Sequence, residues 1–280
     1  MSAVLSSACQ MVDSVSLSPY ADMMDRYKAL TKYSPYSISI SGEKGITPFD
    51  TIRVGKPDSK QYLMQITEAA INGHPANITF DTGAGVNVIT DSLANAYGLE
   101  LLDANVAATG VASSAGRYAV AKELKLGNIT VKDVPFYVID IRSHHEEADK
   151  YTNVFELVVG SELMLQLKDV TLDFSAKEIQ VPLITSAPSN VRPNMSFSSD
   201  MNLLTAAETN QQPMLIKLDS GDSSYGRLNK AFFEANKDYL TSQCQSDTVN
   251  QAGVGGVWSV LCYKLQDATL TIGGNTVKLP

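Results

Sequence analysis

The chain has 280 residues, of which 44% are hydrophobic and 19% are charged, so it should form one large or two ordinary folded domains rather than a disordered polypeptide. The net charge of -8 argues against a nucleic-acid partner or an anionic membrane surface. No apolar run approaches the roughly 18 residues that span a bilayer, and the N-terminus lacks the basic start and apolar core of an intact signal peptide.

Residues 1–50 are interpreted as an N-terminal arm. Ser18, followed by Pro19, predicts the start of a helix, because serine caps helices and proline is tolerated in the first turn. The segment 32–48 is rich in Ser, Tyr, Gly and Pro, which predicts irregular chain or an edge strand. A packing arm is the favoured interpretation, and a pro-segment is the alternative.

A first β-rich domain is predicted over residues 51–185. Alternating strands joined by a hairpin turn at Asn72 and Gly73 lead into Asp81, and a short helix follows until Gly98 ends it. The small residues from Gly110 to Gly116 predict a mobile hairpin tip.

The rest of this domain is predicted to contain a charged loop, a buried strand, a helix and a closing hairpin, over 142–153, 157–160, 161–167 and 170–181. His144 and His145 in the charged loop stand beside two glutamates, which raises the question of a metal site. Adjacent side chains point apart in most backbones, so the loop is interpreted as solvated. No Cys/His cluster has the spacing of zinc ligands. Residues 186–212 are interpreted as a linker.

Beyond the linker, in 213–280, the order of features repeats. The apolar stretch 214–218 leads into Asp219, a helix is predicted over 228–236, and a glycine-rich tip follows at 253–258. The final stretch 270–278 (Leu-x-Ile-Gly-x-x-Thr-Val-Lys) parallels 124–132 (Leu-x-Leu-Gly-x-x-Thr-Val-Lys). The acid and the glycine of this stretch are 46 residues apart in one copy (81 to 127) and 54 in the other (219 to 273). We therefore expect an internal duplication.

The repeat suggests a chemistry for the two acids. Asp-x-Gly alone is weak, because most such tripeptides are ordinary turns. Two copies related by a two-fold arrangement would bring Asp81 and Asp219 together, and neighbouring carboxyls then share one proton. The ionised carboxylate can take a proton from water while the protonated one polarises a carbonyl. The hydroxyls of Thr82 and Ser220 would brace the pair, and the two glycine-rich tips would act as lids.

The residues Phe80-Asp81-Thr82-Gly83-Ala84 resemble the active-site motif of the retropepsin-like and pepsin-like aspartic proteases, and 157–160 resembles the apolar-apolar-glycine element of that fold. The resemblance, strongest over 61–182, implies a mostly β fold of acid-protease β-barrel lobes of the bacterial two-lobe type. It implies an aspartic endopeptidase that acts on peptide or protein substrates without a metal or organic cofactor, outside the cytoplasm, in the periplasm or at the cell surface of a bacterium. The implied catalytic residues are Asp81 and Asp219, and the implied supporting residues are Thr82, Gly83, Ala84, Ser220 and Gly221. The implied flap or substrate-binding residues are Gly110, Val111, Gly116, Gly253, Gly255, Gly256 and Trp258.

Two departures from the family pattern leave alternatives open. Asp222 stands where the family has a small residue, and it would either raise the pKa of its neighbours or point outward. After Gly273 only 7 residues remain, against 55 between Gly127 and Pro182, so the second lobe is predicted to be incomplete. The alternatives are a catalytically inactive peptide-binding module of the same fold and a homodimer that uses Asp81 from two chains. Cys244 and Cys262 could form a disulfide or remain free thiols.

Overall fold

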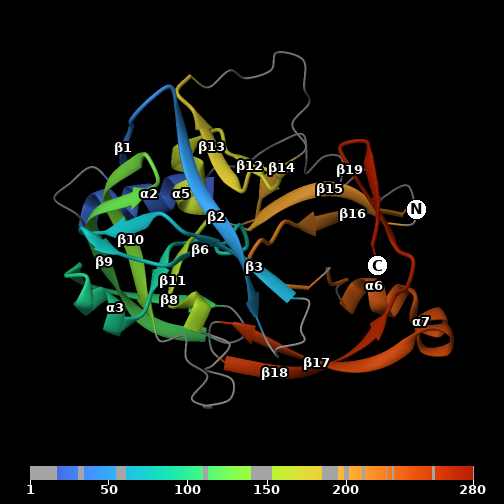
Figure 1. Ribbon diagram of the computed structural model, residues 1–280. Coiled ribbons are helices and arrows are strands. Elements are labelled where there is room, and N and C mark those ends of the chain that lie inside the picture. The colour runs from blue at the N-terminus through green and yellow to red at the C-terminus, as the bar shows by residue number, and fades with distance from the viewer. Residues whose placement is uncertain are drawn as a thin grey trace.

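The computed structural model describes residues 18–30, 35–54, 61–109, 113–139, 153–184, 195–198, 202–209, 212–224, 226–228, 230–253 and 256–279. The described chain is mostly β, as predicted, with one α-helix before the first strand and the others between strands (Figure 1). It divides into a large first lobe, which is one 13-stranded sheet, and a smaller second lobe with a 5-stranded and a 2-stranded sheet.

The first-lobe sheet is strongly curled and carries three α-helices. Its strands are β1 (Ser37–Ile40), β2 (Lys44–Val54), β3 (Gln61–Ile66), β4 (Ala69–Ile71), β5 (His74–Pro75), β6 (Ile78–Phe80), β7 (Val88–Ile89), β8 (Glu100–Thr109), β9 (Ser113–Leu126), β10 (Ile129–Ile139), β11 (Leu157–Val159), β12 (Thr171–Asp173) and β13 (Glu178–Pro182). The helices are α2 (Ser18–Leu30), α3 (Asp91–Ala96) and α5 (Ser161–Leu167), and a 3-10 turn, η1 (Asn153–Phe155), precedes β11.

Three short strands at the centre of this sheet position the candidate site. β11 lies between β6 and β7, parallel to the first and antiparallel to the second, and β7 in turn pairs in parallel with β10. Every residue of these three strands is buried, which agrees with their unbroken apolar sequences. The loop from Asp81 to Asn87 therefore emerges from the interior of the sheet.

The N-terminal arm is part of the first lobe, which corrects the predicted boundary at residue 50. Strand β2 spans that boundary and pairs with both β3 and β13, so cutting there would divide a ladder. Met23 and Tyr27 of α2 are 4% and 1% exposed and belong to the main apolar core. The segment predicted as irregular chain or an edge strand contains β1, an edge strand that pairs with β10 alone among the described strands, and the first part of β2.

A buried carboxyl connects this arm to the loop at the candidate site. Glu162 of α5 is fully buried and accepts hydrogen bonds from the hydroxyls of Tyr27 and Tyr36, each at 2.7 Å, and from the backbone N–H of Asn87 at 3.1 Å. The Asn87 side chain donates to the Tyr36 hydroxyl at 3.0 Å and accepts from the N–H of Gly160 at 2.9 Å. Burial raises the pKa of Glu162 to about 7, although these three donors act to lower it.

The second lobe begins earlier than predicted. Its 5-stranded sheet consists of β14 (Met195–Phe197), β15 (Leu203–Thr209), β16 (Gln212–Lys217), β19 (Thr269–Ile272) and β20 (Asn275–Lys278). Because β14 and β15 lie within 186–212, that segment is not simply a linker: β15 is the strand that joins β16 to β19. The remaining elements are α6 (Lys230–Ala235), α7 (Lys237–Gln243) and the hairpin of β17 (Gln245–Gly253) and β18 (Gly256–Lys264).

One hairpin has the same register in both lobes. Leu124 pairs with Val131 in the first lobe, and Leu270 pairs with Val277 in the second, each across a two-residue turn that begins with a glycine at a φ of 56°. The two hairpins are formed by the stretches 124–132 and 270–278, which have parallel sequences.

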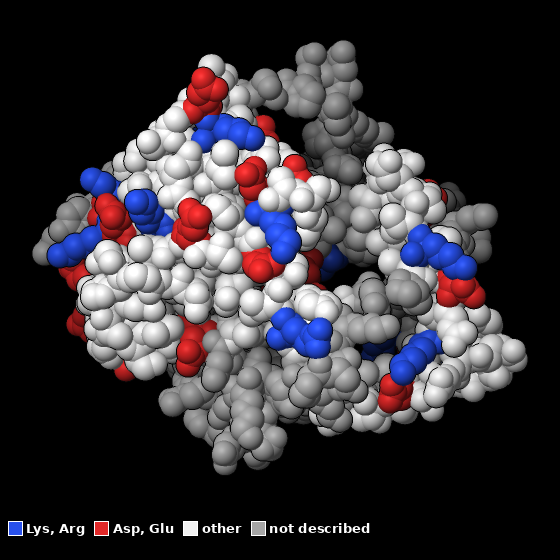
Figure 2. All heavy atoms as spheres, viewed as in Figure 1, with Lys and Arg blue, Asp and Glu red and all other residues white. Residues whose placement is uncertain are grey.

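The molecular surface carries charges of both signs. On the face shown in Figure 2, the Lys and Arg side chains are interspersed with Asp and Glu side chains and do not form one extended patch. Within the described residues, no helix is both long enough and apolar enough to span a membrane. Cys244 and Cys262 are free thiols.

Candidate active site

Asp81 stands directly after β6, where the chain leaves the buried centre of the first lobe. Its N–H donates to the carbonyl of Val159 at 3.0 Å, which fixes the backbone to β11. In the turn that follows, the N–H of Ala84 donates a hydrogen bond to the carbonyl of Asp81 at 3.2 Å, and the N–H of Gly83 donates one to Asp81 Oδ1 at 2.7 Å. The carboxyl is thus held by its own turn.

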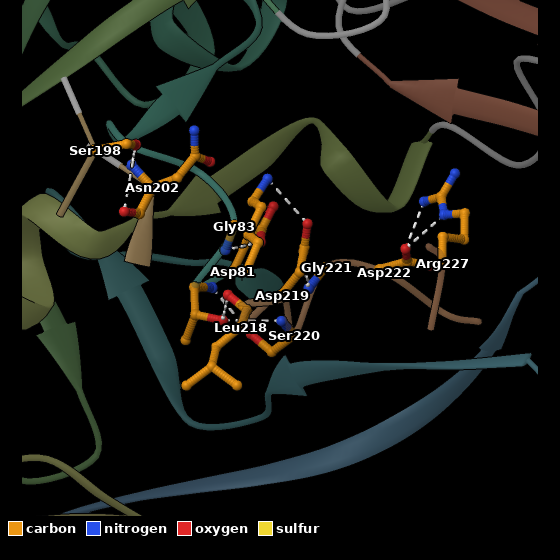
Figure 3. Close-up of polar contacts among 12 residues, drawn as sticks. Asp81, Gly83, Ser198, Asn202, Leu218, Asp219, Ser220, Gly221, Asp222 and Arg227 are labelled. Atoms are coloured by element: carbon orange, nitrogen blue, oxygen red, sulfur yellow. Dashed lines mark hydrogen bonds and ion pairs between the residues drawn. The ribbon is translucent and has the colours of Figure 1, made fainter. Parts of the chain in front are cut away.

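Asp219 is held in the same way in the second lobe. One residue, Leu218, separates it from the end of β16. The N–H of Asp222 donates to the carbonyl of Asp219 at 3.2 Å, and the N–H of Gly221 donates to Asp219 Oδ1 at 3.0 Å. The contacts repeat those of Asp81 with nearly equal lengths. The two turns therefore present their carboxyls in matching local geometry, as Figure 3 shows.

Four reciprocal hydrogen bonds join the two turns. Thr82 Oγ1 donates to the carbonyl of Leu218 at 2.9 Å and accepts from the N–H of Ser220 at 2.9 Å. Ser220 Oγ donates to the carbonyl of Phe80 at 2.7 Å and accepts from the N–H of Thr82 at 3.0 Å. Each of the two hydroxyls predicted to brace the acids bonds to the backbone of the opposite turn.

The glycines of the two turns allow the carboxyls to approach. A Cβ added to Gly83 would lie 2.2 Å from Cγ of Asp219, and one added to Gly221 would lie 2.3 Å from Cγ of Asp81. Each carboxyl consequently packs against the glycine of the opposite turn. A larger residue at either position would have to displace the opposite carboxyl or the turn that holds it.

The carboxyl of Asp81 is strongly affected by this placement. Burial and the neighbouring charge of Asp219 raise the pKa of Asp81 to about 7, while the N–H of Gly83 and the charge of Lys217 act to lower it. Such a pair retains one proton up to near-neutral pH, so it holds an acid and a base side by side.

Lys217 is a charged residue of the site that the sequence analysis missed. Its Nζ lies 3.0 Å from Asp219 Oδ2, at the end of β16. The signal was present in the sequence, because a lysine interrupts the apolar run Met214-Leu-Ile-Lys-Leu218 two residues before the acid. The first lobe has Thr79 at the same offset from Asp81.

Asp222 is directed away from the pair, which decides between its two predicted orientations. Its Oδ2 accepts a hydrogen bond from Nε of Arg227 at 2.9 Å, and Figure 3 shows both side chains to one side of the two turns. The pKa of Asp222 is lowered despite its partial burial, because the Ser224 N–H and the Arg227 guanidinium stabilise its charge. It is therefore not a third member of the pair.

The predicted lid residues fall into three groups. Gly110, Val111 and Gly255 lie outside the described residues, as do His144 and His145. Gly116 is not at a tip: it lies in β9 between β8 and β10, where an added Cβ would be 2.1 Å from the carbonyl oxygen of Val138. Gly253 and Gly256 pair with each other at the described ends of β17 and β18, and Trp258 of β18 is 57% exposed.

A comparison with known protein families finds a match within the first lobe. Residues 67–163 match the aspartyl protease family, a segment that includes Asp81 and strand β11. This match confirms the resemblance to aspartic proteases inferred from residues 80–84. A retropepsin-like aspartic protease of known structure from Rickettsia conorii is 14% identical, with 52% of this chain and 93% of that chain covered and a TM-score of 0.30. A search of curated proteins found no match. The internal duplication and the bacterial, extracytoplasmic location stay predictions.

Proposed function

We propose that this chain, whose residues 67–163 match the aspartyl protease family, is an aspartic endopeptidase that uses a water molecule activated between Asp81 and Asp219. The observation that supports this proposal most strongly is the reciprocal contact of each carboxyl with the glycine of the opposite turn. Ordinary Asp-x-Gly turns have no reason to meet in pairs.

In the proposed reaction, the pair carries one proton and one negative charge. The ionised carboxylate removes a proton from the water, and the water oxygen attacks the carbonyl carbon of the peptide bond. The protonated carboxyl donates a hydrogen bond to the carbonyl oxygen, where negative charge develops. Proton transfer to the amide nitrogen then allows the C–N bond to break, which yields a carboxylic acid and an amine. No covalent intermediate with the protein forms.

The two alternatives from the sequence require different arrangements. A homodimer that pairs Asp81 with its own copy would have to displace the second turn, whose Gly221 already packs against the carboxyl of Asp81. A peptide-binding module without catalysis is favoured by one observation, the ion pair that Lys217 makes with Asp219 Oδ2, because it engages an oxygen that would otherwise contact water. Catalysis and binding can be separated by experiment.

The test measures both cleavage and binding. A mixture of unstructured peptides is incubated with the wild-type chain, Asp81→Asn and Asp219→Asn between pH 4 and pH 7, and the products are identified by mass spectrometry. We expect cleavage by the wild type and a loss of at least about 1000-fold in each variant, because each lacks one carboxyl of the pair. Asp91→Asn, at an exposed ion pair with Arg117, is the matched control and should cleave normally.

Unchanged cleavage by Asp81→Asn would overturn the proposal. Peptide binding by the wild type and by both variants, with no product from any of them, would instead support the binding module.

A further inference from the structure

The environment of the pair is asymmetric in charge, although its backbone contacts are nearly symmetric. Lys217 Nζ lies 3.0 Å from Asp219 Oδ2, and the other oxygen of Asp219 accepts from the N–H of Gly221. The side chains of Lys217 and Asp219 are 40% and 26% exposed, so the ion pair is only partly screened by water. Asp219 thus has a cation on one side and Asp81 on the other.

The equivalent position in the first lobe carries no charge. Thr79 is fully buried, and its hydroxyl donates to the carbonyl of Val154 in the first-lobe interior. The other nearby acid, Asp222, is paired with Arg227 and points away. Among the described residues, the cation in ionic contact with the pair is therefore Lys217 of β16, and it contacts Asp219.

We propose that Lys217 is a positioning residue that fixes the charge distribution of the pair, holding the negative charge on Asp219 and leaving the shared proton on Asp81. The inference rests on the proposed function and adds roles to it. Asp219 is then the base that takes the proton from water, and Asp81 is the acid that donates a hydrogen bond to the substrate carbonyl. Two identical turns would leave these roles interchangeable.

The physical reason is that a cation stabilises the anionic forms of a carboxyl pair. It favours loss of the first proton, which creates the active singly ionised state, and also loss of the second, which destroys that state. Both limbs of the pH–rate profile are therefore moved toward acid by Lys217. The burial that raises the pKa of Asp81 acts in the opposite direction, so the lysine offsets part of it.

The first experiment compares pH–rate profiles for peptide cleavage. Lys217→Met keeps the length of the side chain without its charge, and Lys217→Thr copies the residue found in the first lobe. Both variants should shift the whole profile toward higher pH by about one unit. This value is at the low end of the pKa shift that a close opposite charge causes in a carboxyl, because the ion pair is partly exposed to water. Lys217→Arg should restore the wild-type profile. Lys278→Met removes a cation from an ion pair with Asp267 elsewhere in the second lobe and should leave the profile unchanged.

The second experiment does not depend on cleavage. The two carboxyls are titrated by NMR in protein labelled with 13C at the aspartate side chains, and their signals are assigned with Asp81→Asn and Asp219→Asn. In the wild type, the Asp219 signal should change first as the pH rises, and in Lys217→Met both transitions should move upward by about one pH unit. Equal behaviour of the two carboxyls in the wild type would overturn the proposal.

The two experiments separate this proposal from the proposed function. A titration shift without any peptide cleavage would support the role of Lys217 and contradict the protease. Cleavage with the same pH profile in the wild type, Lys217→Met and Lys217→Thr would support the protease and contradict the role of Lys217. If Lys217→Met and Lys217→Thr changed the rate but not the pH profile, and Lys217→Arg also failed to restore the rate, Lys217 would act through packing. That result would also contradict the proposal.

Discussion

The two lobes contribute almost the same turn to the candidate site from very different surroundings. The main apolar core of the described chain contains only first-lobe residues, from Met23 to Val181. In the second lobe the buried apolar residues are few (Ala207, Leu240 and Ala268), whereas large apolar side chains such as Leu261 and Val277 are more than half exposed. Asp81 therefore follows a strand of a sheet with a large apolar core, whereas Asp219 follows a strand of a sheet with few buried apolar residues.

This difference shows where the rigidity of the second turn comes from. Asp219 has little core beneath it, but its turn makes four hydrogen bonds to the first-lobe turn and packs a glycine against Asp81. We infer that the first lobe organises the second at the site.

The largest expected effect comes from matched substitutions in the repeated hairpin. Leu124 of the first lobe is fully buried, and its counterpart Leu270 is only partly buried. Leu124→Ala should destabilise the protein by about 3–5 kcal/mol, because it leaves a cavity in a packed core. Leu270→Ala should cost on the order of 1 kcal/mol, because less apolar surface is lost. Urea unfolding measures both values, and equal costs would mean that the second lobe has a core of similar quality.

Much of this comparison could be predicted from the sequence, and some could not. The strand–acid–turn of Asp81 and the repeated hairpin are local patterns of apolar residues and glycines, so they were identifiable. The assignment of 1–50 and 186–212 as arm and linker was wrong in part, because strands β2, β14 and β15 are defined by distant partners rather than by their own composition. Lys217 and Glu162 matter through contacts that only the fold creates.

Glu162, the buried carboxyl that ties the arm to the loop at the site, should make the stability of the chain depend on pH. Its folded pKa is raised to about 7 from an ordinary value of 4.5, so the folded chain binds more protons than the unfolded chain between these pH values. The stability of the wild type should therefore fall as the pH rises from 4.5 to 7. Glu162→Gln does not titrate and should gain up to about 3 kcal/mol relative to the wild type between pH 4.5 and pH 8.

Urea unfolding at several pH values measures this difference. Tyr27→Phe is the companion variant: it removes one hydrogen bond to the Glu162 carboxylate, so the loss of stability should extend to higher pH than in the wild type. A stability difference between the wild type and Glu162→Gln that does not change with pH would contradict the prediction.

A smaller effect is expected from removing the hydroxyls that join the turns. Thr82→Val and Ser220→Ala each delete one donor and one acceptor between the lobes, leaving a partly buried carbonyl and N–H without these partners. Each should cost about 1–3 kcal/mol. The two costs should be similar despite the unequal cores, because the contacts are reciprocal. Unfolding of the two single variants and the double variant tests this, and a cost confined to Thr82→Val would show that the second turn is held by its own lobe.

The smallest effect is expected at the position where the two turns differ most in sequence. Asp222 occupies the place of Ala84, yet both N–H groups close their turns on the preceding aspartate carbonyl at 3.2 Å. Asp222→Ala makes the second turn a copy of the first and removes the ion pair with Arg227 and an exposed hydrogen bond from the Ser224 N–H, which water can replace. It should therefore cost no more than about 1 kcal/mol and change cleavage less than about 3-fold. Arg227→Gln deletes the same pair from the other side but leaves the Asp222 carboxylate in place. If Arg227→Gln impaired cleavage far more than Asp222→Ala, the arginine would be holding a harmful negative charge away from the pair, and the asymmetry between the lobes would extend beyond Lys217.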